Sequence, residues 1–394
     1  MTKIYIVDDD IQIAELLTAT IDSIGLNSQY FTNARQFIQL SVDEVDIILL
    51  DINMPDIDGI EVLRTLGKNK CQAHLVLISG HDKGVLHSAE QLAQAHSLKV
   101  AATFTKPVQI NELKKLILEV SQNTSALYNT SSTTKSLPTV EELKKAITEK
   151  QLVLHYQPQI DIKTGELRGV EALVRWQHPE RGMVFPDQFI GLAERNGLIG
   201  DLTASVIAMS IEQSREWQNS GLITKISVNI SSDNITSLSL PEQLIDMLGH
   251  NELDPTRLTL EVTESALMGE LVTSLDILTR LRMKGFGLSI DDFGTGYSSL
   301  SQLHKIPFTE LKIDQSFIMS MTQDHESKAI VKTCILLGHE LNMELVAEGV
   351  ETQEILEILK EFGCDIAQGY HISRPIPADA LLNWVMKKTP LDVA

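Results

Sequence analysis

The sequence predicts an α/β protein of two units: an N-terminal doubly wound (flavodoxin-like) parallel sheet and a C-terminal TIM-like (β/α)8 barrel. Three observations predict this fold class. Short apolar runs alternate with segments of helical period in both halves of the chain, as in parallel α/β sheets. A stretch rich in Ser, Thr and Asn separates the two halves. The second half has roughly 255 residues, the usual size of such a barrel.

The first half, residues 1–122, contains strand-like runs that alternate with helical segments. The clearest helical segments are "IAELLTATIDSI" and "INELKKLILEV", and the strand-like runs are "KIYIV", "VDIILL", "HLVLIS" and "VAATF". In an open parallel sheet, ligands bind beyond the carboxyl ends of the strands. The residues that follow these runs are therefore the first candidates for a binding site.

The boundary between the halves is marked by composition. Residues 121–138 read "SQNTSALYNTSSTTKSLP" and carry no apolar periodicity, which predicts an interdomain linker over residues 123–138. The following "TVEELKKAI" offers Thr139 as a helix N-cap and Glu142 three positions later. This capping-box pattern opens a new helix and the second domain, residues 139–394.

The second half contains eight strand-like runs, most of them separated by helix-length segments. The runs are "LVLHYQ", "GVEALV", "KISVNI", "LTLEV", "GLSID", "ELKID", "ELVAE" and "CDIAQ". Only "PQIDIKTGELR", with the turn signal Thr164-Gly165, lies between the first two runs. That connection is too short for a parallel crossover and suits a hairpin. We therefore expect the first barrel strand to run antiparallel to the others.

Composition limits the classes of partner. The 33 basic and 53 acidic residues give a net charge of −20, which opposes attachment to DNA or to an anionic membrane. The three cysteines show no CxxC or Cys/His pattern, so nothing supports a zinc site or disulfide framework. The N-terminus lacks a signal-peptide plan and no later apolar run is long enough to span a bilayer. We expect a cytoplasmic protein.

Polar residues follow the strand-like runs of the first half in a distinctive order. An acid pair comes first, then an acid, a hydroxyl and a lysine: Asp8 and Asp9, Asp51, Ser79, and Lys106 before Pro107. A single acid after a strand is usually a solvated loop end or a helix cap. Four strand ends that carry an acid pair, an acid, a hydroxyl and a lysine in this order are much harder to explain in that way.

These residues resemble the receiver domain of bacterial response regulators over residues 1–122. The resemblance implies that Asp51 accepts a phosphoryl group and that Asp8 and Asp9 hold Mg²⁺ with it. It also implies that Ser79 contacts the phosphoryl group, that Lys106 pairs with its charge, and that a sensor histidine kinase or phosphotransfer protein is a partner. The chain departs from the family at Thr103, where receivers usually carry Tyr or Phe as a switch, although Phe104 is adjacent.

The barrel strands present polar residues near their carboxyl ends, where barrel enzymes carry catalytic groups. These residues are Glu171, Asn229, Glu261, Asp291, Asp292, Lys312, Glu348 and Gln368. Each residue taken alone could have a purely structural role; Glu171, for example, could pair with Arg175 on the same strand face. Five converging carboxylates require divalent cations, however, and a ligand set of oxygens alone selects Mg²⁺ or Mn²⁺ over zinc. Adjacent carboxylates can bridge two metals, which suits phosphoester hydrolysis.

The same residues resemble the EAL family of cyclic-di-GMP phosphodiesterases, whose name-giving triplet is Glu171-Ala172-Leu173. The resemblance implies two Mg²⁺ or Mn²⁺ ions, one held by Glu171, Asn229, Glu261 and Asp291, and one facing Asp291, Asp292 and Glu348. It implies that Lys312 orients or activates water and that Gln368 positions water or substrate. Arg175 and Gln157 would contact the substrate, with Glu171 and Glu348 also counted as catalytic.

The stretch "FGTGYSSL", residues 293–300, is similar to a flexible loop of that family, which couples metal, substrate and dimerisation. Glu264 matches the glutamate that holds this loop, and a homodimer or higher homo-oligomer is expected. Gly191 replaces a proline common in the family's "FIPLAE", a change expected to alter local stiffness only. The resemblance thus implies a response regulator that opens cyclic-di-GMP to linear pGpG under control of Asp51 phosphorylation.

Two other readings stay in view. A catalytically silent cyclic-di-GMP receptor would act through partner binding, but such a module has no need of Lys312 together with every acid. A DNA-binding response regulator is disfavoured, because the chain is acidic and offers no basic reading helix.

Overall fold

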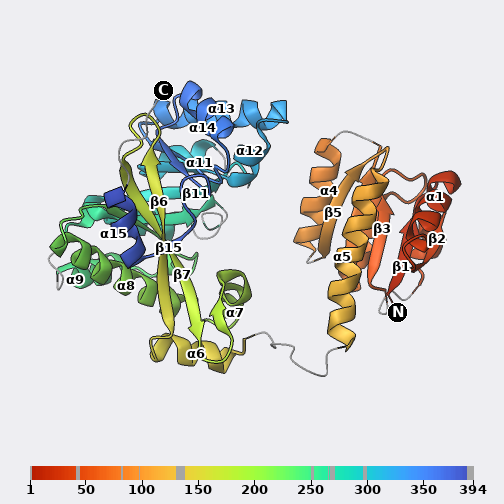
Figure 1. Cartoon of the computed structure of the whole chain (residues 1–394), viewed down its shortest axis with the longest axis horizontal. Helices are drawn as coiled ribbons and strands as arrows, with labels where there is room; N and C mark the ends of the chain where they lie inside the picture. The colour runs from red at the N-terminus through yellow and green to blue at the C-terminus, as the bar shows by residue number, and fades with distance from the viewer. Residues whose placement is uncertain are drawn as a thin grey trace. The chain divides into compact units, whose positions relative to one another are not determined.

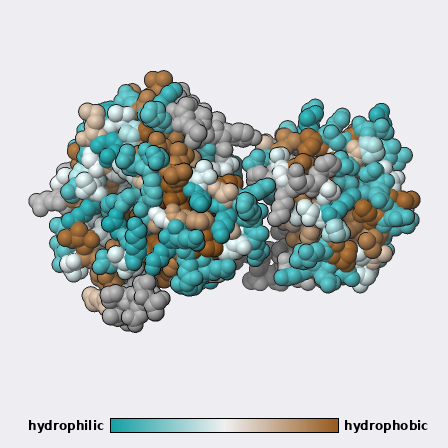
Figure 2. Space-filling view, turned by 90° about the horizontal axis from the view of Figure 1, so that it is seen from above, coloured by the Kyte–Doolittle hydropathy of each residue, from teal (hydrophilic) through white to brown (hydrophobic). Residues whose placement is uncertain are grey.

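The computed structural model describes residues 2–40, 45–80, 83–96, 98–129, 138–249, 253–264, 266, 271–295 and 300–387. The chain divides into two compact units, Met1–Lys135 and Ser136–Ala394. Each unit is described by itself. None of the described helices has both the length and the apolar character needed to cross a membrane. On the face seen in Figure 2, hydrophobic residues form small groups between larger hydrophilic areas.

The first unit is built on a parallel sheet in the order β2-β1-β3-β4-β5 (Figure 1). This is the flavodoxin-like order and confirms the predicted fold class. The strands are β1 Lys3–Val7, β2 Asn27–Phe31, β3 Ile47–Asp51, β4 His74–Ser79 and β5 Lys99–Thr105. The sequence pattern missed β2, whose residues "NSQYF" are exposed or half-buried and so lack an apolar run.

Helices cover both faces of this sheet. Side chains of α1 and α5 pack in one apolar cluster, and those of α2, α3 and α4 pack in another. The helices are α1 Ile11–Asp22, α2 Ala34–Phe37, α3 Gly59–Lys68, α4 Lys83–Ala95 and α5 Ile110–Asn129. Helix α5 therefore includes residues 123–129, which the sequence pattern had placed in the linker. Ser, Thr and Asn are weak helix formers but do not stop a helix as Pro does, and extending an existing helix is cheap.

Eight of the described strands of the second unit close into a barrel. They are β6 Leu152–Asp161, β7 Leu167–His178, β9 Lys225–Asn229, β10 Leu258–Thr263, β11 Gly287–Phe293, β12 Glu310–Ile313, β13 Glu344–Ala347 and β14 Ile366–Gln368. Strand β6 pairs antiparallel with both β7 and β14, and the other barrel pairs are parallel. The predicted antiparallel first strand and its hairpin are thus confirmed.

Two short strands, β8 Gly182–Val184 and β15 Ile376–Pro377, extend the sheet. Figure 1 shows β6 and β7 reaching beyond the barrel toward α6 and α7. Residues from these four elements and α8 form a satellite core there. The helix α6 begins with the predicted capping box: Thr139 N donates to Glu142 Oε2 at 2.7 Å, and Glu142 N donates to Thr139 Oγ1 at 3.2 Å.

The main core of this unit surrounds the barrel and joins its strands to the helices around it. The helices are α6 Val140–Thr148, α7 Ile190–Arg195, α8 Ile199–Asn219, α9 Leu240–Gly249, α10 Leu271–Met283, α11 Leu300–Lys305, α12 Gln315–Ser320, α13 His325–Glu340, α14 Gln353–Phe362 and α15 Ala378–Lys387, with short 3-10 turns η1 Pro186–Gln188, η2 Asn234–Thr236 and η3 Pro255–Arg257. Because the core lies outside the strands, the strand faces that point inward can carry polar groups.

Candidate active site

The predicted acid and lysine positions of the first unit meet at the carboxyl edge of its sheet. Lys106 Nζ lies 2.8 Å from Asp8 Oδ2 and 2.7 Å from Asp51 Oδ2. Asp8, Asp9 and Asp51 can each offer a carboxylate oxygen within 4.8 Å of the others. Burial raises the pKa of Asp8 against the opposing effect of Lys106. An anionic cluster with one lysine is suited to a divalent cation and a phosphoryl group.

Ser79 is fully buried at the end of β4, at the same edge of the sheet. Burial alone would lower the pKa of Lys106. The hydrogen bonds from Lys106 to Asp51 and Asp8 outweigh this effect and raise the pKa. Thr103 lies in β5 and is half-buried, as is Phe104. The departure from the receiver pattern at Thr103 thus lies on the strand that leads to Lys106.

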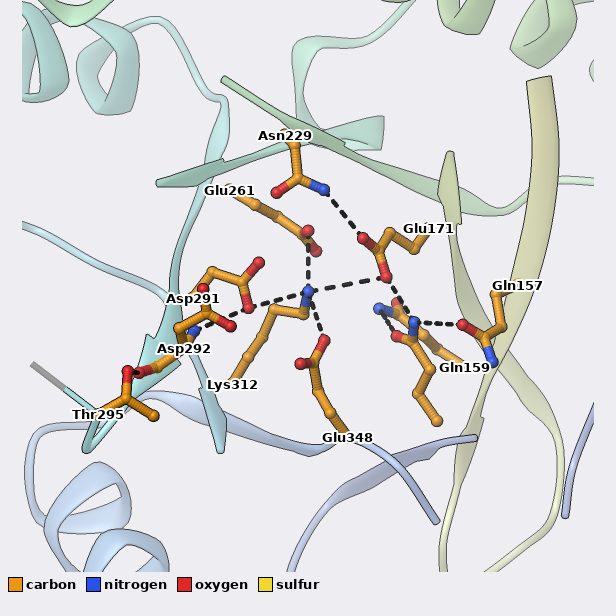
Figure 3. Close-up of polar contacts among 11 residues, drawn as sticks. Gln157, Gln159, Glu171, Asn229, Glu261, Asp291, Asp292, Thr295, Lys312 and Glu348 are labelled. Atoms are coloured by element: carbon orange, nitrogen blue, oxygen red, sulfur yellow. Dashed lines mark hydrogen bonds and ion pairs between the residues drawn. The ribbon is translucent and has the colours of Figure 1, made fainter. Parts of the chain in front are cut away.

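The polar residues predicted for the barrel converge on one point (Figure 3). The strands β7, β9, β10, β11, β12 and β14 supply Glu171, Asn229, Glu261, Asp291 with Asp292, Lys312 and Gln368, and Glu348 follows β13. Parallel strands bring their carboxyl ends to one rim, which explains why residues distant in the sequence meet.

Lys312 lies at the centre of the acids. Its Nζ is 2.7 Å from Glu348 Oε1, 2.9 Å from Glu261 Oε2, 3.2 Å from Asp291 Oδ1 and 3.7 Å from Glu171 Oε2. The side chain is fully buried. Burial alone would lower the pKa of Lys312, but the surrounding carboxylates outweigh it and raise that pKa well above its usual range. In this arrangement the lysine is an ammonium ion that donates hydrogen bonds.

Asp291 and Asp292 both reach the site, although consecutive strand residues normally point to opposite faces. Two features of β11 allow it. The register of β11 against β12 shifts between Ile290 and Phe293, and Asp292 has a left-handed φ of 55°, which aspartate tolerates better than most residues. As a result Asp291, Asp292 and Glu348 can each offer an oxygen within 4.8 Å of the others.

The excess of acids perturbs their protonation. Burial raises the pKa of Glu348 to about 8, and burial with the neighbouring Asp291 raises the pKa of Asp292 to about 6. Burial also raises the pKa of Glu261 well above its usual range. One lysine is therefore too little positive charge for these acids.

The residues present fit hard divalent cations. Glu261 Oε1 is buried and has no hydrogen-bond partner within the described part of the chain, although an ionised carboxylate normally accepts several bonds. The converging ligands are carboxylate and carboxamide oxygens, the donor set of Mg²⁺ and Mn²⁺.

Glu171 is held by two amide side chains. Asn229 Nδ2 donates to Glu171 Oε1 at 2.9 Å, and Gln368 Nε2 donates to Glu171 Oε2. Gln368 Nε2 also lies 3.0 Å from Gln157 Oε1. A residue that the sequence pattern did not predict, Gln159, donates from Nε2 to Gln368 Oε1 at 2.8 Å. The available signal was alternation on β6, which places Gln157 and Gln159 on one strand face.

A pocket of about 300 Å³ opens beside these acids, lined among others by Gln157, Arg175, Tyr370 and Glu348. Arg175 is 8% exposed, its Nε has no hydrogen-bond partner within the described part of the chain, and its Nη1 donates to Val174 O. Burial lowers the pKa of Arg175. In the described part of the chain Glu171 forms its ion pair with Lys312, and the Arg175 guanidinium lies over the Phe185 ring at 5.5 Å. Arg175 Nε thus remains available to donate to an anionic ligand.

The predicted anchor of residues 293–300 makes its contact. Glu264 is buried, and its Oε2 accepts a hydrogen bond of 3.0 Å from Gly294 N. Gly294 has a φ of 101°, a conformation that glycine adopts without strain. Residues 296–299 of this stretch lie outside the described residues, so the loop function stays a prediction.

Each half of the chain matches the model of a known protein family. A response regulator receiver domain model matches residues 4–118, and an EAL domain model matches residues 140–375. The chain belongs to the EAL domain family. The EAL match covers the barrel and the residues that surround Lys312, and the receiver match covers the Asp51 site.

The relatives match this chain over different shares of their own length. The cyclic di-GMP phosphodiesterase RocR of Pseudomonas aeruginosa is 30% identical over 345 residues, 87% of this chain and 88% of RocR. The bifunctional diguanylate cyclase/cyclic di-GMP phosphodiesterase MucR of the same species is 43% identical over 247 residues, 62% of this chain. The chain spans about a third of MucR and of the oxygen sensor protein DosP of Escherichia coli, 36% and 32%.

A solved structure described as the MucR phosphodiesterase in complex with c-di-GMP matches with a TM-score of 0.59 and 43% identity, over 61% of this chain and 98% of that one. A solved EAL domain protein from Listeria monocytogenes matches with a TM-score of 0.56 and 31% identity, over 62% of this chain and 97% of that one. The barrel architecture is thus shared with EAL domains.

Proposed function

We propose that this chain is a cyclic-di-GMP phosphodiesterase that opens its substrate to linear pGpG. The observation that carries the proposal is the cluster of five carboxylates, four of them within 3.7 Å of the fully buried Lys312 Nζ, beside a pocket of about 300 Å³ lined by Arg175. The names of RocR and MucR support cyclic-di-GMP as the substrate. In the reaction, water oxygen bonds to one phosphorus and the P–O3′ bond breaks, which leaves a 5′-phosphate and a protonated 3′-hydroxyl.

The proposed cation ligands are two overlapping sets: Glu171, Asn229, Glu261 and Asp291, and Asp291, Asp292 and Glu348. Mg²⁺ or Mn²⁺ bound there would supply the charge that acidifies water and stabilises the phosphate oxygens. Arg175 donates to a substrate phosphate, and Gln157 contacts substrate at the pocket wall. Lys312 donates to the acids and orients water among them. Gln368 and Asn229 hold Glu171 in place through their amide groups.

We further propose that phosphorylation of Asp51 by a histidine kinase or phosphotransfer protein changes the rate of hydrolysis. Asp51 is 2% exposed and bonded to Lys106, so a phosphoryl group there must rearrange the Lys106 contacts. Such a local change acts on the barrel only if it biases two arrangements of the protein. A change in the geometry of the homodimer or higher homo-oligomer expected from the sequence is one candidate for such a pair of arrangements.

The test is to incubate the full chain with cyclic-di-GMP and Mg²⁺ and to separate the products by chromatography. We expect linear pGpG, and none from Glu171→Ala. Binding of cyclic-di-GMP without any product would instead establish a silent receptor. Adding a small-molecule phosphodonor should change the rate of wild type but not of Asp51→Asn, with mass spectrometry to confirm that only wild type is modified. Equal rates for fully phosphorylated and unmodified wild type would refute direct control.

A further inference from the structure

Gln159 is the last member of a series of buried, hydrogen-bonded amide side chains that leads to Glu171. Gln159 Nε2 donates to Gln368 Oε1 at 2.8 Å, and Gln368 Nε2 donates to Glu171 Oε2. Gln159 and Gln368 are each 3% exposed. Figure 3 shows Gln159 next to Gln157, on the side of the site where Glu171 lies.

The register of three strands explains this alignment. Gln159 lies opposite Gln368 in the antiparallel pair β6–β14 and opposite Gly169 in the antiparallel pair β6–β7. Gln157 lies opposite Glu171 in the latter pair. Directly opposite residues of antiparallel strands share a face and lie within side-chain contact. The contact between Gln159 and Gln368 therefore follows from the backbone.

Gly169 leaves the space that the Gln159 side chain uses. A Cβ added at Gly169 would lie 2.9 Å from Gln159 Oε1, closer than such atoms normally approach. Any other residue at position 169 would therefore force the Gln159 amide to shift.

Glu171 sets the donor-to-acceptor direction of this series of hydrogen bonds. An ionised carboxylate only accepts hydrogen bonds, so Gln368 must turn its NH₂ group toward Glu171. The carbonyl oxygen of Gln368 then points away and, being buried, needs a donor. Gln159 supplies that donor. With the Gln368 amide reversed, its oxygen would face a carboxylate oxygen and push Glu171 from its place.

We propose that Gln159 is a positioning residue for the hydrolysis: it holds the Gln368 amide in the orientation that donates to Glu171, and it acts only through Gln368. This inference rests on the proposed phosphodiesterase function. It assigns a role in the reaction to a residue that touches neither the pocket nor the five carboxylates.

The first experiment is a double-mutant cycle in the full chain with Gln159→Met, Gln368→Met and the pair. We expect Gln159→Met to lower kcat about 10-fold, as for other partners of metal ligands, with KM within about 2-fold of wild type. In the Gln368→Met background the same change should have no further effect. The matched control is Gln177→Met, an exposed glutamine of β7. Equal losses in both backgrounds, or a wild-type kcat for Gln159→Met, would overturn the proposal.

The second experiment needs no substrate: calorimetric titration of each variant with Mn²⁺. Gln159→Met should bind Mn²⁺ about 10-fold more weakly, with no added effect in the Gln368→Met background. If wild type binds Mn²⁺ but does not hydrolyse cyclic-di-GMP, the proposed function fails and this cycle still decides the role of Gln159. If thermal melting shows that Gln159→Met is unfolded, Gly169→Ala replaces it in the titration. The added Cβ would lie 2.9 Å from Gln159 Oε1 and shift that amide. Unchanged Mn²⁺ affinity in the folded variant would overturn the proposal.

Discussion

Replacing Lys312 by Met should destabilise the cation-free protein strongly. The change removes a fully buried positive charge that lies 2.7–3.7 Å from four carboxylates. Removing one partner of a buried ion pair costs about 3–5 kcal/mol, because the opposite charges remain buried. At about 2–4 °C per kcal/mol for a domain of this size, the melting temperature should fall by about 6–20 °C.

The loss should depend on pH with a definite sign. The folded state raises the pKa of Glu348 to about 8, above its ordinary value of about 4.5. Between about pH 4.5 and pH 8, Glu348 binds more protons in the folded protein than in the unfolded chain. The free energy of unfolding therefore falls as pH rises through this range. Lys312→Met removes the charge that opposes this shift. The deficit of the variant should therefore be smallest near pH 5 and largest near pH 9.

The assay is thermal melting of wild type and Lys312→Met at pH 5, 7 and 9, with a chelator and again with saturating Mn²⁺. Bound Mn²⁺ restores positive charge and should reduce the deficit, as expected for a ligand of the folded state, while turnover stays at least about 100-fold low. The control is Lys163→Met, an exposed lysine of the β6–β7 turn. A deficit that is independent of both pH and Mn²⁺ would refute the electrostatic reasoning.

Three further predictions follow from single contacts. Arg175→Lys should raise KM about 10-fold with a smaller effect on kcat, because the planar fork for phosphate is lost; steady-state kinetics test it, and an unchanged KM contradicts it. Glu264→Ala removes the acceptor for Gly294 N and should weaken Mn²⁺ binding and turnover about 10-fold, whereas wild-type values would leave Glu264 a local structural role. Thr139→Ala removes the cap of α6 and should cost about 1 kcal/mol in chemical denaturation without changing turnover.

Sequence patterns sufficed where a residue's surroundings are local or repeat regularly. The capping box at Thr139 depends on residues three positions apart, and the antiparallel β6 follows from a connection too short for a crossover. The strand ends carrying Asp51 and Lys312 are marked by buried apolar runs. Strand β2 and the last residues of α5 were missed, because their order comes from packing and helix extension instead of an apolar pattern.

The sequence by itself determined the two α/β units and the polar residues at the strand ends, and it predicted that the acids bind cations. Only the tertiary structure decided how those groups meet. The register shift and left-handed φ at Asp292 turn two consecutive acids toward one point, and burial among four carboxylates makes Lys312 a donor. Gln159 contacts Gln368 because closure of the barrel pairs β6 with β14 and places the two residues opposite each other. Distances and desolvation arise when distant strands pair, and no local pattern encodes them.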